Sequence, residues 1–199
     1  MIATSCYEFR NTLYEELGHK TMCLRGADAE SFEVLKWGLA RDKKKVSKGC
    51  YVIKANPQTF RQITSLYSTD GQEVFYDTRV VPEADPATFE FIGGRSWVKD
   101  KSRVFFQAEI VPGPDPATSR VVGDLLADAS AVFLDICGKV VEGLDAATVE
   151  HLGYSYYRDK SRVYSRFDNT FIEGADRDTF EKLPPKHPSG GSAWDKNWI

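Results

Sequence analysis

The stretch that decides the fold runs from Tyr154 to Leu183 and reads YSYYRDKSRVYSRFDNTFIEGADRDTFEKL. An Asp-Lys turn at Asp159 separates two aromatic-rich runs, and a Gly-Ala-Asp-x-x-Thr-Phe step follows a short apolar segment at Phe171. Both features recur along the chain. The sequence is therefore a set of repeats, which defines the architecture more firmly than any single motif.

The Asp-x-x-Thr-Phe step occurs six times with modest variation. The copies begin at Asp28, Asn56, Asp85, Asp115, Asp145 and Asp176. Their starting residues are 28, 29, 30, 30 and 31 positions apart. A spacing this regular, within roughly 20–50 residues, indicates a repeat architecture.

The Asp-Lys turn keeps the same period, 13 to 15 residues after the start of the first five steps. Its copies are Asp42-Lys43, Asp70-Gly71, Asp100-Lys101, Asp128-Ala129 and Asp159-Lys160. Apolar residues follow four of these turns, but Lys44 and Lys45 follow Asp42-Lys43. The first repeat, residues 1–35, is irregular, as terminal repeats that cap an array often are.

Each repeat can be built from elementary rules. Short polar residues favour a tight turn at the Asp-Lys position, and the Val, Phe and Tyr runs on either side predict a hairpin. A third apolar segment predicts another strand. The Asp-x-x-Thr step begins with a residue favoured at helix N-caps, followed in three copies by Pro, so we expect one or two helical turns there. The Phe after the step should point inward.

We therefore predict a mainly β protein of about six ~30-residue repeats, each a short β-meander with a capped helical turn. Neighbouring repeats must stack, because one repeat cannot bury its own apolar face. We expect them to pack into one curved body and leave an open solenoid as the alternative. The repeat domain should span residues 1–183.

Residues 184–199 form a Pro/Gly-rich tail that contains Trp194 and Trp198. We expect this tail to dock on the repeat domain, with a groove of a partner as the alternative.

Composition indicates an ordinary globular protein, since 42% hydrophobic residues exclude the disordered class. The N-terminus shows no basic segment followed by an apolar run, so we expect a cytoplasmic location. The four cysteines are far apart, and we expect them to be small buried residues. They are Cys6, Cys23, Cys50 and Cys137.

Arg158-Asp159-Lys160-Ser-Arg-Val163-Tyr164, with Lys99-Asp100-Lys101-Ser-Arg-Val104-Phe105-Phe106 and Ile172-Glu-Gly174-Ala175-Asp176, resembles the signature of the bacterial DKNYY repeat family. The resemblance covers about residues 26–183 and is weakest around Asp42 and Asp128. It transfers no catalytic motif. It does imply a likeness to proteins that are encoded beside secreted bacterial toxins, such as those delivered by type VI secretion, and neutralise them.

Nothing in the sequence predicts catalysis, a metal or a cofactor. Asp176 and Asp178 could form a catalytic pair, but an aspartate repeated six times at one position is better explained by the fold. His151 takes the place of Phe91 in another repeat, so it is a framework position. No phosphate-binding loop, zinc motif or calcium loop is present.

Charge is unevenly distributed. Residues 36–54 contain seven Lys or Arg and one acid, whereas residues 109–150 contain eight acids and two bases. Such asymmetry concerns partners and association, although two solvated faces explain it equally well. The basic run lacks the features of a nucleic-acid-binding module, and no segment suits a membrane.

Our leading hypothesis is a non-enzymatic protein-binding module, a cytoplasmic immunity protein that binds and blocks a nuclease-type toxin with a basic active-site face. The expected contact residues are Asp124, Asp128, Asp135 and Glu142. The alternatives are a scaffold or adaptor that binds other proteins, and an enzyme that uses departures from the repeat.

Overall fold

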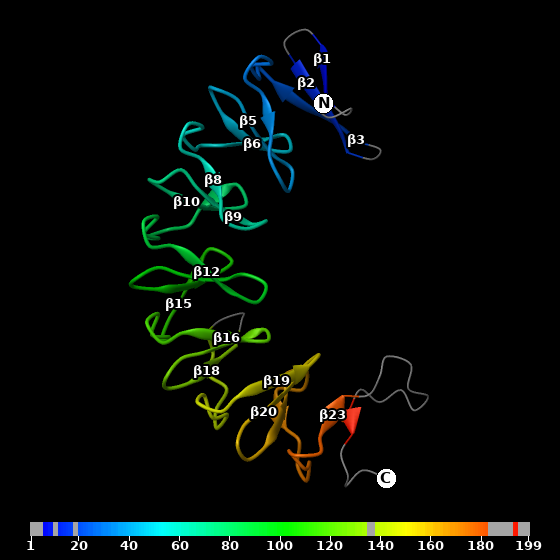
Figure 1. The fold of residues 1–199 in the computed structure, drawn as a ribbon, viewed down its shortest axis with the longest axis vertical. Helices are drawn as coiled ribbons and strands as arrows, with labels where there is room; N and C mark the ends of the chain where they lie inside the picture. Colours follow the sequence, from blue (N-terminus) through cyan, green and yellow to red (C-terminus); the bar gives the residue numbers. More distant parts are fainter. Residues whose placement is uncertain (1–5, 10–11, 18–19, 135–137, 183–192, 195–199) are drawn as a thin grey trace. The chain divides into compact units, whose positions relative to one another are not determined.

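The structure is a computed structural model that describes residues 6–9, 12–17, 20–134, 138–182 and 193–194. These ranges contain 24 short strands in seven antiparallel sheets and no helix (Figure 1). Accordingly, the described part of the chain has no helix that could cross a membrane. The predicted mainly β class is confirmed.

The strands follow the repeats. The irregular first repeat forms a sheet of β1 (Cys6–Phe9), β2 (Thr12–Leu17) and β3 (Lys20–Arg25). The next two sheets comprise β4 (Glu33–Val34), β5 (Leu39–Arg41), β6 (Val46–Lys48) and β7 (Tyr51–Ile53), then β8 (Arg61–Gln62), β9 (Tyr67–Thr69), β10 (Val74–Tyr76) and β11 (Arg79–Val80).

Four further sheets complete the fold. They comprise β12 (Glu90–Gly93), β13 (Trp97–Lys99), β14 (Val104–Phe106) and β15 (Glu109–Val111); β16 (Arg120–Val122), β17 (Leu125–Ala127) and β18 (Val132–Phe133); β19 (Glu150–Gly153), β20 (Tyr156–Arg158), β21 (Val163–Ser165) and β22 (Thr170–Phe171); and β23 (Glu181–Lys182) with β24 (Ala193–Trp194).

Each four-stranded sheet is a meander, because its strands pair in chain order. The Asp-Lys turn joins the second and third strands, as β20 and β21 show around Asp159. The sheet β16–β18 lacks only a formal fourth strand, and Val140 makes a β-bridge to Phe133 in its place. The predicted hairpin and third apolar segment are therefore confirmed, and an additional first strand follows each step in these sheets, as β19 does at Glu150.

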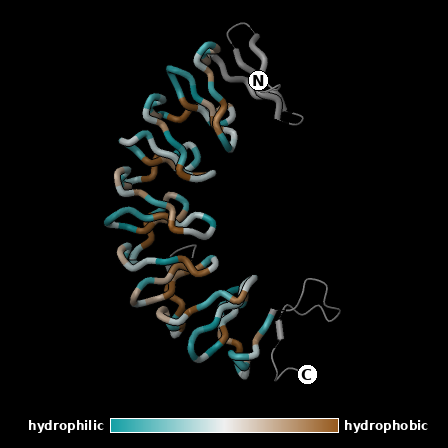
Figure 2. Tube along the Cα trace, viewed as in Figure 1, coloured by the Kyte–Doolittle hydropathy of each residue, from teal (hydrophilic) through white to brown (hydrophobic). Residues whose placement is uncertain are grey.

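Successive side chains of a strand point to opposite faces of the sheet. Consecutive residues of these strands are apolar, so both faces of the sheet are apolar. In β17 and β18 the paired residues Leu126 and Phe133 pack with Trp97 of the sheet before. Leu125 and Val132, one position away, belong instead to the cluster that contains Tyr157 of the sheet after. Figure 2 shows hydrophobic colour on the strands and hydrophilic colour on many turns.

The residue that ends the step packs in several repeats against the sheet that precedes it. Phe60 joins the cluster of Leu39, Val46 and Ile53, and the Phe180 ring lies 5.3 Å from that of Tyr156. Most of these residues are buried, as the sequence predicts: Phe60 5%, Phe89 7%, Ser119 9%, Val149 4% and Phe180 7% exposed.

The predicted helical turns are wrong. Each step is a single turn, as at Asp85, where the N–H of Thr88 donates to the Asp85 carbonyl at 3.2 Å. The next residue, Phe89, is buried and Glu90 already begins β12, so no room is left for a ladder of i→i−4 bonds. Asp followed by Pro also suits the first two positions of a type I turn, and the step does form a turn closed by the bond from Thr88 to Asp85.

The chain divides by its contacts into two compact units, residues 1–91 with 107–109 and residues 92–106 with 110–199. One further expectation differs from the structure. Cys50 is an exposed free thiol, not a buried residue, because it lies in the turn between β6 and β7. Of the C-terminal tail, β24 pairs with β23, and the rest lies outside the described residues.

We expect Phe89→Ala and Phe180→Ala each to lower the free energy of unfolding by about 3–5 kcal/mol, since each removes a buried ring between repeats. Phe167→Ala is the matched control, because Phe167 is 87% exposed, and should change it by less than about 0.5 kcal/mol. Urea denaturation measures all three. Losses below about 1 kcal/mol for both buried rings would contradict the proposed packing.

A candidate protein-binding edge

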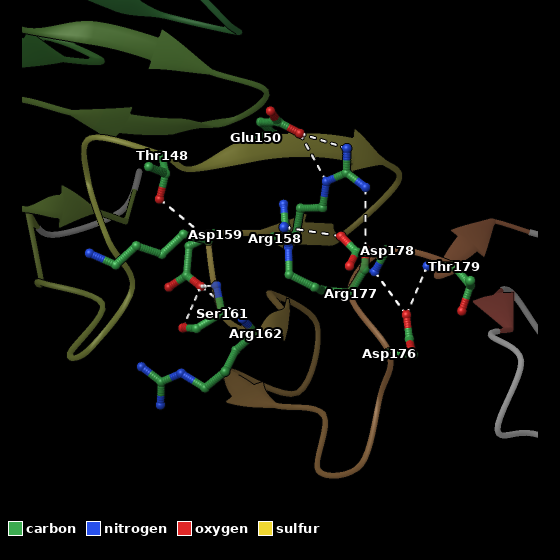
Figure 3. Close-up of polar contacts among 11 residues, drawn as sticks. Thr148, Glu150, Arg158, Asp159, Ser161, Arg162, Asp176, Arg177, Asp178 and Thr179 are labelled. Carbon is green, nitrogen blue, oxygen red and sulfur yellow. Dashed lines mark hydrogen bonds and ion pairs between the residues drawn. The ribbon is translucent and has the colours of Figure 1, made fainter.

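The Asp-Lys turn is built around one buried carboxylate. Asp159 is 1% exposed. Its Oδ1 accepts hydrogen bonds from the N–H of Ser161 at 2.7 Å and of Arg162 at 2.8 Å, and from the Ser161 hydroxyl at 2.9 Å (Figure 3). One oxygen thus satisfies three donors of the turn.

The second oxygen joins the turn to the step of its own repeat. Asp159 Oδ2 accepts from the N–H of Asp145 at 3.1 Å. Lys160 binds the step through two further contacts. Its Nζ forms an ion pair with Asp145 Oδ2 at 2.6 Å, and its N–H donates to Thr148 Oγ1 at 3.0 Å. The Asp and Lys of the signature and the Asp and Thr of the step therefore bind one another.

The same arrangement recurs in the other compact unit. Asp42 Oδ2 accepts from the N–H of Asp28 at 2.8 Å, and Lys43 Nζ lies 2.9 Å from Asp28 Oδ2. Ser31 replaces threonine and accepts from the Lys43 N–H at 3.0 Å. These residues serve the fold, in agreement with their repetition in the sequence.

The network also changes acidities. Burial alone would raise the pKa of Asp159, but the N–H donors of Ser161, Asp145 and Arg162 outweigh it, and the net pKa lies below the ordinary value. The hydrogen bond from Lys43 is the main cause that lowers the pKa of Asp28 to about 2. The carboxylates therefore stay ionised well below neutral pH.

A basic residue of the second strand connects successive repeats. Arg158 contacts Glu150 at 2.8 Å, and its NH1 donates to the Arg177 carbonyl in the following step at 3.3 Å (Figure 3). Lys99 reaches the Pro116 carbonyl in the same way at 2.9 Å. The Asp-Lys turns and the steps lie together at one end of the strands, which we call the Asp-Lys edge, and its signature residues hold the repeats.

The opposite edge carries the other turns of each meander, the tips between the first two strands and between the last two. Large side chains are exposed there, in contrast to the Asp-Lys edge. They are Trp37 (50% exposed), Tyr51 (72%), Tyr154 (59%) and Phe167 (87%). The residues at these tips differ between repeats, as binding residues on a constant scaffold do.

Two of these aromatic residues have strained backbones. Trp37 has φ 56° and Tyr154 has φ 48°, the left-handed region that is costly for residues with a Cβ. Gly94 and Gly123, at comparable tips in other repeats, both have φ 61°. Asp77 and Asn169 hold a similar φ at other tips, so the feature particular to Trp37 and Tyr154 is an exposed ring at a position with a costly backbone.

Two hollows flank Trp37. One, of about 600 Å³, is lined by Val34, Leu35, Lys36, Trp37, Gln62 and Ile63. The other, of about 430 Å³, is lined by Trp37, Gly38, Lys48, Gly49, Cys50, Tyr51, Asp77 and Thr78. We call Trp37, Tyr51 and these two hollows the Trp37 surface.

The structure does not bring the predicted contact residues together. Asp124 lies at the tip between β16 and β17, 3.7 Å from Arg95 and 3.9 Å from Arg166. Glu142 is exposed, but it follows Val141 at the other end of the sheet.

Asp128 is 5% exposed, and it is the Asp of an Asp-Lys-type turn. Its carboxylate accepts from the N–H groups of Asp115, Ser130 and Ala131, so it is not displayed to a partner. Asp135 lies outside the described residues.

Ion pairs also reduce the net charge of the basic sector, residues 36–54, and of the acidic sector, residues 109–150. Asp145 pairs with Lys160 and Glu150 with Arg158. In the basic sector Arg41 pairs with Glu33, Lys43 with Asp28 and Lys48 with Asp77. The charge displayed by each sector is therefore smaller than its sequence count.

The described residues contain no group of three or more His, Cys, Asp or Glu side chains that could hold a metal ion. His151 lies at the second position of β19, as Phe91 does in β12, which confirms the equivalence drawn from the sequence. Its Nε2 lies 3.0 Å from the Tyr154 carbonyl.

Comparison with known families agrees with this architecture. The model of the DKNYY family matches residues 4–79, 47–109 and 76–184, which together cover most of the chain. The chain belongs to the DKNYY family. No curated protein and no solved structure matches it significantly. Overlapping matches are what several copies of one repeat produce, and the Asp and Lys of the DKNYY signature are the turn residues described above.

We expect Asp159→Asn to lower the free energy of unfolding by about 1–3 kcal/mol, because the amide loses the charge and cannot accept at both oxygens. Asp178→Asn is the control, since that side chain is 77% exposed and pairs only with Arg177 among the contacts seen, and should cost less than about 1 kcal/mol. Equal effects in urea denaturation would contradict the central role of the turn.

Stability should also depend on pH. The lowered pKa values of Asp42, Asp70, Asp128 and Asp159 mean that the native state holds these carboxylates ionised more strongly than the unfolded state does. The free energy of unfolding should be level above about pH 5 and fall as the pH drops from about 4 to 2. Urea titrations across that range test this, and Asp159→Asn should flatten the decline.

Proposed function

We propose that this protein is a non-enzymatic protein-binding module. The supporting observation is the contrast between the two edges of its sheets. The signature residues at the Asp-Lys edge are occupied with one another, whereas the tips expose aromatic side chains that differ from repeat to repeat. Exposed aromatic residues on a rigid scaffold are typical of protein interfaces.

We further propose that the partner is a bacterial toxin, of nuclease type, whose active site the module blocks in the cytoplasm. The resemblance to toxin-neutralising proteins favours this partner over an unrelated protein bound by a scaffold. Asp124 and Glu142 remain candidates for contacts with a basic toxin surface, since complementary charge speeds association.

The test is co-expression of the wild-type chain with the product of the adjacent reading frame. We expect the two proteins to co-purify and the chain to restore growth of cells that produce the toxin. Co-purification without rescue would favour the scaffold alternative. If the two proteins fail to bind and growth is not restored, the toxin assignment is contradicted.

Charge reversal tests the contribution of the acids. Asp124→Lys and Glu142→Lys should each weaken binding to the toxin and reduce its dependence on salt, by up to about tenfold in the association rate. Glu173→Lys is the control, an exposed acid outside the predicted set. Unaltered kinetics in both variants would show that these acids lie outside the interface.

A further inference from the structure

The Trp37 surface has features that stability does not explain. Trp37 and Gly38 form the tip between β4 and β5, with φ 56° and 75°. A two-residue tip of this kind favours Asn-Gly or Gly-Gly. Tryptophan at the first position adds backbone strain and leaves half of a large ring in water.

The side chains of Gln62 and Lys48, one in each hollow, are already bonded to neighbours. Gln62 donates to the Lys36 carbonyl at 2.8 Å and accepts from the Lys36 N–H at 3.3 Å. Lys48 contacts Asp77 at 2.7 Å and the Ser65 carbonyl at 3.3 Å. A sugar or another polar small molecule would need several free groups that converge on it, and these residues do not supply them.

In the first hollow, the groups left to recognise a ligand are apolar surface and one cation. Val34 is 42% exposed beside Trp37, and Tyr51 is 72% exposed across the second hollow. Lys36 is exposed and makes no ion pair among the described contacts, and it is the one charged side chain that lines the first hollow. Aromatic rings that flank a hollow are typical of protein hot spots.

We propose that the Trp37 surface binds a peptide segment of a protein partner, in which an apolar side chain enters a hollow beside Trp37 and an adjacent carboxylate meets Lys36. The segment is therefore apolar and acidic. This deepens the protein-binding function proposed above and rests on it. The surface lies wholly within the first compact unit.

The test uses a phage-displayed library of random dodecapeptides, selected on the wild-type chain. We expect the enriched peptides to share an aromatic or aliphatic residue next to Asp or Glu. Trp37→Gly should weaken binding of a synthetic enriched peptide at least about tenfold, and Lys36→Ala should weaken binding of acidic peptides more than of their amide analogues. Trp37→Phe should retain most of the affinity.

The Tm of the Trp37 variants is a separate control for correct folding. Glycine and asparagine both tolerate a positive φ, so relief of strain should offset the lost packing and keep the Tm of Trp37→Gly and Trp37→Asn within about 3 °C of the wild type. Phe91→Ala is the matched control for binding, since Phe91 is 44% exposed in the same compact unit but lines neither hollow.

Several outcomes would overturn the proposal. They are unchanged peptide binding by Trp37→Gly, a large fall in its Tm, Trp37-dependent binding to a glycan array, and Trp37-dependent dimers in sedimentation. If Trp37→Gly still co-purifies with the adjacent toxin, this surface is excluded while the proposed function stands. If the wild-type chain does not bind the toxin, the peptide selection still tests whether the Trp37 surface binds peptides.

Discussion

One carboxylate in each repeat holds two turns together. In four repeats the second oxygen of the Asp-Lys aspartate accepts from the first N–H of the step, at 2.8 Å for Asp42, 2.9 Å for Asp70 and Asp128 and 3.1 Å for Asp159. A buried carboxylate without such donors would be strongly destabilising. This oxygen therefore joins the step to the Asp-Lys turn of the same repeat, while the apolar faces of a sheet such as β16–β18 pack against the sheets before and after it.

The repeats, their β class and their buried aromatic residues could be predicted from the sequence, because period and alternation are local signals. The form of the step could not be predicted. Asp-Pro suits both a helix N-terminus and a type I turn, and the start of β12 at Glu90, directly after Phe89, decides between them. The division into two compact units depends on contacts between distant residues, which no local pattern contains.

The candidate site was predictable only in part. Charge counts drew attention to Asp128, yet its position in the repeat already marked it as the turn aspartate, and the structure buries it. The Trp37-Gly38 pair contains the missed signal, an x-Gly dipeptide between two short strands, which is typical of a hairpin tip. Its strained backbone becomes visible only with coordinates. Scaffold residues are thus the repeated ones, and exposed aromatic residues appear where the repeats differ.

The bonds of the Asp-Lys turn stay within one repeat, as between Asp145 and Asp159 or Asp28 and Asp42. Contact between repeats relies instead on apolar faces and on a basic side chain that binds a backbone carbonyl of the next step, as Arg158 and Lys99 do. A gene duplication that inserts one whole period of 28 to 31 residues therefore leaves the internal bonds of every copy intact. Unequal recombination can therefore change the number of repeats and place different tip residues next to one another. New binding surfaces can arise in this way without a new fold.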